Sequence, residues 1–201
     1  EVIAKYDNIA KCIHLPVQTG SSKMLQKMGR EHNIGRFQDI TKKARELMPN
    51  VTITTDIIVG FCGETEQDFE KTLDLFDQEK FLVAFISKYS PRKGTISGDK
   101  MEDDVADTEK KSRFTRLTQK MAEISLAENT KRIGTIEHVL IDSVVFSEKT
   151  QDYLGSGKTE FGRTCQVEVG AKKERFIGKI FPIKITNATA WAVKGTSVDV
   201  L

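Results

Sequence analysis

The stretch from Gly60 to Glu64 brings two glycines, a cysteine and a carboxylate together. Gly60 and Gly63 carry no Cβ atom, so a ligand or a second backbone segment can approach them closely. Cys62 lies between the glycines, where a ligand can reach its thiol, although burial as a small apolar side chain is the favoured interpretation. The stretch therefore predicts either a ligand pocket or, with equal weight, a tight turn that is purely structural.

A strand and a helix must hold this turn. Ile53–Val59 is rich in β-branched residues, and its Ile57–Val59 run is apolar on both faces, which predicts a buried parallel strand covered by helices on each side. Thr65 followed by Asp68 resembles a capping box, so we expect a helix to begin there with its amide dipoles directed at the turn. Strand, turn and helix in this order are typical of ligand sites in α/β proteins.

Two further predicted strands also end in polar residues. Lys11–Val17 is followed by Gln18, whose side chain is the preferred polar contact at that strand end. Leu82–Tyr89 leads to Arg92, whose guanidinium is either solvated or holds a carboxylate or phosphate, while Tyr89 is either a core or a rim residue. The connections between strands are long enough for helices. The three strands should therefore be parallel, with their carboxyl ends on one rim.

Helical periodicity accounts for most of the intervening chain. Apolar residues at helical spacing predict three helices, at residues 35–47, 66–80 and 108–132, with a polar surface loop at 96–107. A short helix that carries Met24, Leu25 and Met28 is also expected after the polar turn at residues 18–22. The Lys110–Arg113 run is interpreted as the solvated face of the last helix, with a phosphate contact as the less favoured alternative. His14, in the first strand, is interpreted as a satisfied interior histidine rather than a base.

From residue 134 the pattern changes to short strands. Five candidates, separated by turn signals such as Gly155–Gly157 and Asn187, lie at residues 136–141, 143–146, 162–169, 176–185 and 190–193. They predict a small all-β barrel of the OB-like kind. Such barrels often bind nucleic acid through basic and aromatic side chains, here Lys172, Lys173, Arg175, Lys179, Phe161, Phe176 and Trp191. An ordinary barrel with a solvated lysine-rich hairpin is the alternative.

Bulk composition excludes several classes of protein. The chain of 201 residues is 38% hydrophobic with a net charge of +2, so it can build a core and is no polycation. Cys12, Cys62 and Cys165 are odd in number and widely spaced, which argues against a disulfide framework. No apolar run approaches the roughly 18 residues of a membrane span. A cytoplasmic location is therefore expected.

Four segments resemble the radical S-adenosylmethionine methylthiotransferases: His14–Ser21, Thr55–Thr65, Tyr89–Thr95 and Ala188–Gly195. The resemblance covers nearly the whole chain in order. The Pro-Val-Gln-Thr-Gly-Ser form of the first segment is more similar to the tRNA-modifying branch, and within it to the branch that makes 2-methylthio-N(6)-dimethylallyladenosine beside the anticodon.

The resemblance implies a fold and an activity. Residues 1–133 would form the C-terminal half of a partial parallel (β/α) barrel with a long docking helix, and residues 134–201 a TRAM domain, an RNA-binding barrel. The family adds a methylthio group to C2 of an N6-modified adenosine, using S-adenosylmethionine and two 4Fe-4S clusters. The implied partners are the tRNA anticodon stem-loop and an electron donor such as flavodoxin or ferredoxin, and we expect a monomer.

The resemblance also implies which residues hold S-adenosylmethionine. Gln18 would contact the ribose or carboxylate, Val59 and Gly60 would form an apolar shelf for adenine, and the backbone from Tyr89 to Pro91 would meet the adenine edge. Further cofactor-binding candidates are Arg92 and Glu64.

The chain departs from the family in one respect. It contains no Cys-x-x-x-Cys-x-x-Cys motif and no set of cysteines for a second cluster. We therefore interpret it as the C-terminal part of a longer enzyme, inactive alone. Two alternatives stay open: an RNA-binding fragment without catalysis, and the threonylcarbamoyladenosine branch. An unrelated dinucleotide-binding protein is disfavoured because no Gly-x-Gly-x-x-Gly follows a predicted strand.

Overall fold

The computed structural model describes residues 1–148, 151–169 and 176–198. Two compact units divide the chain. An α/β unit comprises residues 13–49 and 53–124, and a barrel unit comprises residues 1–12, 50–52 and 125 onward. The boundary expected between residues 133 and 134 stays a prediction.

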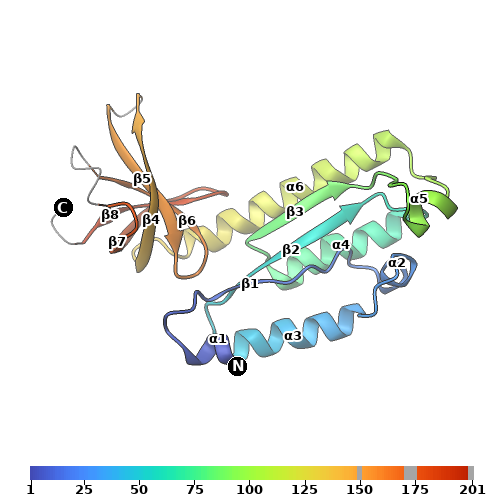
Figure 1. Cartoon of the computed structure of the whole chain (residues 1–201), viewed down its shortest axis with the longest axis horizontal. Helices are drawn as coiled ribbons and strands as arrows, with labels where there is room; N and C mark the ends of the chain where they lie inside the picture. The colour runs from blue at the N-terminus through green and yellow to red at the C-terminus, as the bar shows by residue number, and fades with distance from the viewer. Residues whose placement is uncertain (149–150, 170–175, 199–201) are drawn as a thin grey trace. The chain divides into compact units, whose positions relative to one another are not determined.

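A three-stranded sheet forms the centre of the α/β unit (Figure 1). Its strands β1 (Cys12–His14), β2 (Thr52–Val59) and β3 (Val83–Lys88) are neighbours in that order. β2 and β3 are parallel, in register from Thr54 opposite Val83 to Val59 opposite Lys88, and a parallel bridge pairs Gln18 with Ile57. The parallel arrangement predicted from the long crossover connections is therefore confirmed.

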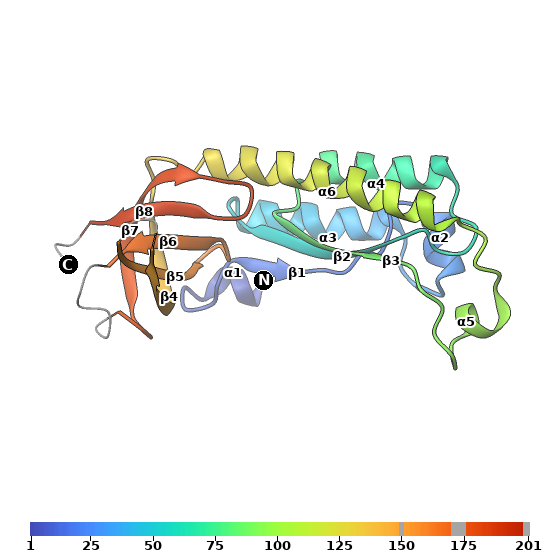
Figure 2. The same ribbon diagram turned by 90° about the horizontal axis from the view of Figure 1, so that it is seen from above.

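The three long helices that pack on the sheet lie on one side of it (Figure 2). They are α3 (Ile34–Leu47), α4 (Glu66–Glu79) and α6 (Asp107–Thr130), whose residues from 125 onward fall in the barrel unit. The α/β unit also contains the short helices α2 (Ser22–Lys27) and α5 (Ile96–Lys100), while α1 (Val2–Lys5) belongs to the barrel unit. Along β2, burial alternates, so Ile57 and Val59 are buried whereas Asp56 and Ile58 are half-buried.

The prediction that helices cover both faces of β2 was therefore wrong. The opposite face carries Phe85 of β3, which is 61% exposed. The β-branched composition of Ile57–Val59 indicated a strand correctly, but coverage depends on elements distant in the sequence.

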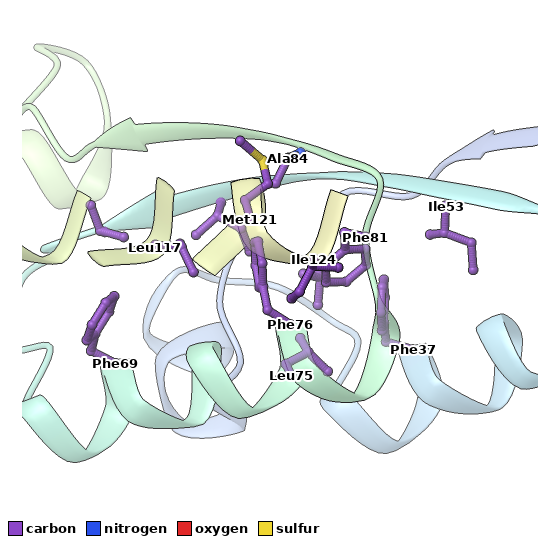
Figure 3. Packing of buried hydrophobic residues seen from close by; sticks show 13 residues of the cluster. Phe37, Ile53, Phe69, Leu75, Phe76, Phe81, Ala84, Leu117, Met121 and Ile124 are labelled. Carbon is purple, nitrogen blue, oxygen red and sulfur yellow. Dashed lines mark hydrogen bonds between the residues drawn. The ribbon is translucent and has the colours of Figure 1, made fainter. Parts of the chain in front are cut away.

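Aromatic and aliphatic side chains from the helices and sheet form one core (Figure 3). Phe76 and Phe81 meet edge to face with ring centroids 5.1 Å apart. Leu117 and Met121 of α6 face this cluster, and both are buried. Burying a large apolar side chain stabilises a fold by about 1.5–3 kcal/mol, so α4 and α6 together hold the sheet that positions the turns.

The segment predicted as a surface loop, residues 96–107, contains the short helix α5. Thr95 caps this helix, because its hydroxyl accepts the Gly98 N–H at 3.0 Å. The threonine is an ordinary N-cap residue, but the polar composition after it concealed the helix.

Five strands close the small barrel of the other unit in the order β4-β5-β6-β8-β7. These are β4 (Ile136–Ser147), β5 (Asp152–Thr159), β6 (Thr164–Glu168), β7 (Ile180–Ala188) and β8 (Val193–Ser197). β6 and β8 pair in parallel, and the other pairs are antiparallel. The prediction of a small all-β barrel is confirmed.

The strand boundaries predicted for the barrel were partly wrong. Gly155–Gly157 lies inside β5, and a Cβ atom on Gly157 would stand 1.9 Å from the carbonyl oxygen of Leu140. These glycines thus allow close approach within the barrel rather than a turn. The candidates at 136–141 and 143–146 form one strand, β4, with a register shift at that point, and Asn187 lies in β7 beside another shift.

Candidate ligand site at the carboxyl ends of the parallel strands

A pocket of about 750 Å³ opens where β2 and β3 end. Ile58, Phe61 and Tyr89 provide apolar wall, and the rings of Phe61 and Tyr89 meet edge to face at 4.8 Å. Hydroxyl groups and long cationic side chains complete the lining, among them Ser87, Ser90, Ser97, Lys27, Arg30, Lys88 and Arg92. The pocket thus combines a surface for a flat ring with groups that hold an anion.

Of the residues predicted from the sequence, Tyr89 and Arg92 line this pocket. Pro91, between them in the chain, is exposed. Lys27, Arg30 and Lys88 were not identified from the sequence. These residues could have been found from their position, because they lie beside a strand end or after the first polar turn. Side chains at such positions reach ligands in α/β folds.

Gln18 is built into the sheet edge rather than the pocket lining. Its N–H donates to Asp56 O at 2.9 Å, and its carbonyl accepts the Ile58 N–H at 2.9 Å. Its φ of 74° lies in the left-handed region, which is uncommon for a residue with a side chain. Residues in sparsely populated backbone conformations cluster at functional sites. The strained backbone of Gln18 is therefore in keeping with a functional role for this residue.

Val59 and Gly60 form the beginning of the glycine turn. The Val59 side chain is 1% exposed in the core, and its carbonyl accepts the Tyr89 N–H at 2.9 Å. Gly60 has φ 73°, and a Cβ atom there would lie 2.3 Å from Cγ of Lys110. The close approach that the glycine permits is used by the chain itself, and the apolar wall of the pocket comes from Ile58 and Phe61.

Glu64 closes the turn through a buried ion pair. Its carboxylate accepts the Gly60 N–H at 2.6 Å and a guanidinium N–H of Arg113 at 2.8 Å. Burial raises the pKa of Glu64, and the Gly60 and Arg113 hydrogen bonds oppose that shift. Glu64 therefore fixes the backbone of the turn.

The prediction that the Lys110–Arg113 run is solvated was wrong for both end residues. Lys110 is 2% and Arg113 is 4% exposed. Lys110 pairs with Asp103 at 2.6 Å and lies over the Tyr89 ring, 5.5 Å from its centroid. Lys110 is neutralised by Asp103 of the preceding loop, and Arg113 by Glu64, far away in the sequence, and by Glu109 of the same helix at 3.0 Å. Composition alone therefore gave no sign that the two cations are buried.

Asp68 joins the two polar turns that follow β1 and β2. Its carboxylate accepts one hydrogen bond from the Ser21 hydroxyl and one from the Thr65 hydroxyl, each at 2.7 Å. Ser21 is the N-cap of α2, and Thr65 is the N-cap of α4. The Thr65 and Asp68 capping box predicted from the sequence is confirmed. Burial alone would raise the pKa of Asp68, but the hydrogen bonds from Ser21 and Thr65 outweigh it and lower the pKa to about 2.

Cys62 is 2% exposed and packs in a small cluster with Met24 and Phe61. Its interpretation as a buried apolar side chain is confirmed. Burial raises the pKa of Cys12, and raises that of Cys165 to about 12. Among the described residues, no group of three or more His, Cys, Asp or Glu side chains is arranged to hold a metal ion.

His14 is exposed on the open face of the sheet, so its interpretation as an interior histidine was wrong. Its Nε2 lies 3.4 Å from an Asp56 carboxylate oxygen, and its Nδ1 lies 3.0 Å from the Thr54 hydroxyl. The ring meets Phe85 edge to face. The satisfied hydrogen bonds were expected, but the side of the sheet could not be inferred from alternation.

On the barrel, Lys179 is exposed and Trp191 is 58% exposed, so both can meet a ligand. Phe176 is 4% exposed in the barrel core and offers no ring to a partner. The predicted contacts Lys172, Lys173 and Arg175 lie outside the described residues. No helix in the described ranges is long and apolar enough to cross a membrane.

Comparison with known proteins gives two concordant matches. The Radical SAM superfamily model matches residues 1–76. The chain is 40% identical over 198 residues to the tRNA-2-methylthio-N(6)-dimethylallyladenosine synthase of Clostridium botulinum strain Okra, covering 98% of this chain and 42% of that protein.

Two more synthases with the same name match over nearly the whole chain. The identity is 36% over 196 residues for Chlorobium luteolum, covering 98% of this chain and 43% of the relative. The identity is 39% over 199 residues for Thermoanaerobacter pseudethanolicus, covering 99% of this chain and 41% of the relative. The chain thus spans about two fifths of the length of these curated relatives. By sequence, residues 1–76 match the Radical SAM superfamily, and nearly the whole chain is a relative of part of these tRNA-modifying synthases.

Proposed function

We propose that this chain is the S-adenosylmethionine-binding and RNA-binding part of a tRNA methylthiotransferase. The full enzyme would add a methylthio group to C2 of an N6-modified adenosine beside the anticodon. The observation that carries the proposal is the 40% identity over 98% of the chain, which runs through both the α/β unit and the barrel. A match confined to one unit would have supported only a shared module.

The pocket and the neighbouring turns suit the nucleoside part of S-adenosylmethionine. Phe61 and Tyr89 offer aromatic surface to adenine, and the hydroxyl groups of Ser87, Ser90 and Ser97 in the same lining can form hydrogen bonds with it. Gln18 would contact the ribose or carboxylate, and the backbone of Val59, Gly60 and Pro91 would complete the cradle. Glu64 would act by holding Gly60 in place. S-Adenosylmethionine bound there would supply the radical chemistry of the full enzyme.

The described residues do not fit a 4Fe-4S cluster. Buried Cys62 and Cys165 belong to different compact units, and no metal-ligating group of three is present in the described ranges. The two clusters and the electron donor, such as flavodoxin or ferredoxin, would be served by residues that this chain does not supply.

In this proposal the α/β unit corresponds to half of a partial parallel barrel, and the five-stranded barrel is a TRAM domain that holds the tRNA. The open face of the sheet (Figure 2) supports the first assignment, because a parallel sheet with one uncovered face is unusual in a complete fold. His14 and Phe85 are both exposed. The exposed Trp191 and Lys179 support the second, since single-stranded RNA stacks on aromatic rings beside cations.

Calorimetric titration with S-adenosylhomocysteine tests the cofactor part of the proposal. We expect the chain to bind it, and Gln18→Asn to bind it more weakly because the shorter amide withdraws from the ligand while asparagine tolerates the left-handed backbone. Asp74→Asn, an exposed change on α4, is the matched control. No heat of binding for the unaltered chain would contradict the cofactor assignment, and equal affinities would reject the role of Gln18.

A further inference from the structure

The pocket at the strand ends carries more positive charge than S-adenosylmethionine can use. Lys27 and Arg30 approach from α2 and the segment after it, and Lys88 and Arg92 from the end of β3. No Asp or Glu residue lines the pocket within the described part of the chain. S-Adenosylmethionine has a sulfonium, an ammonium and a single carboxylate, so its net charge is positive. Four cations without an anion are therefore a poor match for this cofactor alone.

These four side chains are also available to a ligand. All are exposed, and none forms an ion pair within the described residues. Helix cations of the same unit are often neutralised: Arg45 pairs with Glu79, Arg116 with Glu66 and Glu70, and Lys120 with Asp77. The pocket thus gathers cations whose charge the protein leaves open to solvent.

We propose that Lys27, Arg30, Lys88 and Arg92 form a phosphodiester subsite for the RNA strand that carries the modified nucleotide, beside the S-adenosylmethionine cradle. The inference rests on the proposed function for the identity of the substrate as RNA. Cations at the rim of the pocket match the phosphodiesters of an RNA strand, which would take the charge while the apolar wall holds the adenine of the cofactor. The subsite lies in the α/β unit, so the barrel is not the sole RNA contact.

Such a subsite would position the target nucleotide. Exposed aromatic groups on the barrel bind RNA without fixing one nucleotide against the cofactor, whereas phosphate contacts set the register and orientation of a strand. A pair of phosphate contacts at the rim of the cradle would hold the target base next to the reacting group of S-adenosylmethionine.

Binding of a fluorescein-labelled anticodon stem-loop RNA, measured by anisotropy across a salt series, tests the inference. The variant is Lys27→Gln with Lys88→Gln, and the matched control is Lys71→Gln with Lys111→Gln, two exposed lysines of α4 and α6 outside the pocket. Each phosphate contact contributes about 0.7–0.9 to the slope of log K against log salt, so the pocket variant should lower the slope by about 1.4–1.8 and the affinity by about 25- to 60-fold at about 0.1 M salt. The control should retain the slope of the unaltered chain.

A second arm replaces single phosphodiesters of the loop by neutral methylphosphonates. We expect one or two positions at which this change weakens binding to the unaltered chain but not to the pocket variant. Equal slopes for the pocket variant and the control would overturn the subsite while leaving the proposed function intact. Failure of the unaltered chain to bind the stem-loop at low salt would overturn the proposed function together with the subsite.

Discussion

Replacing Asp68 by Asn should cost the α/β unit about 2 kcal/mol of unfolding free energy at neutral pH. The carboxylate accepts hydrogen bonds from the hydroxyl groups of Ser21 and Thr65. It also forms an ion pair with the ammonium group of Lys23 at 3.2 Å. The amide group of Asn has the same shape and keeps one acceptor oxygen. Its NH2 group replaces the other oxygen and would face a hydroxyl donor whose hydrogen bond it cannot accept. Because the pKa of Asp68 falls from 3.8 to about 2 on folding, the ionised group contributes about 1.4 kcal/mol for each pKa unit.

The stabilisation by Asp68 depends on pH. The folded-state pKa is lower than the unfolded one, so the stabilisation by Asp68 is complete above pH 4 or so and is lost as the pH falls towards about 2. The gap in stability between the unaltered chain and Asp68→Asn should therefore be widest at neutral pH and should shrink below about pH 4.

Urea unfolding followed by far-UV circular dichroism measures the effect, because the long helices lie largely in the α/β unit. Fluorescence of Trp191, the single tryptophan, reports on the barrel unit in the same samples. Asp74→Asn, a change of equal charge at an exposed position of α4, should stay within about 0.5 kcal/mol of the unaltered chain. An Asp68→Asn variant equally stable at neutral pH, or a gap that does not vary with pH, would refute the reasoning.

Three further changes test the glycine turn and the cofactor assignment. Arg113→Met should cost about 3–5 kcal/mol in urea unfolding, because it leaves the buried Glu64 carboxylate without its cation; a loss under about 1 kcal/mol would contradict the buried pair. Gly60→Ala should cost at least about 1 kcal/mol more than Gly94→Ala, since both have positive φ but the new Cβ meets Lys110 only at Gly60; equal losses would show that Lys110 yields freely. Treatment of the chain with iron and sulfide should give no stable iron–sulfur absorbance, and a cluster that survives gel filtration would contradict that expectation.

Local signals predicted the helices and their caps well. The Thr65 and Asp68 pattern predicted a capping box because both partners lie within one helical turn, and the structure confirms it. The three parallel strands followed from the long crossover connections. These features depend on neighbours in the sequence or on connection length, so a single chain is enough to infer them.

Features that depend on distant partners were missed. Glycines in β5 were interpreted as a turn because the same residue permits a turn or a close approach, and only the position of Leu140 decides between them. The buried Glu64 and Arg113 pair joins residues from different elements, and it concealed Arg113 within an apparently solvated basic run. The pocket cations other than Arg92 were missed for the same reason. Lys27 and Lys88 are far apart in the sequence, and only the fold brings them to the lining of one pocket.

The central claim is that this chain performs the work of the matching region in a tRNA methylthiotransferase. The most direct test grafts it in place of that region in the Clostridium botulinum synthase, which it matches at 40% identity, and measures methylthiolated adenosine by mass spectrometry of tRNA from cells that lack their own synthase. We expect the chimera to restore the methylthio group and Gln18→Asn to reduce its amount. A chimera that folds and binds its iron–sulfur clusters, yet leaves the tRNA unmodified while the parent enzyme modifies it, would contradict the account.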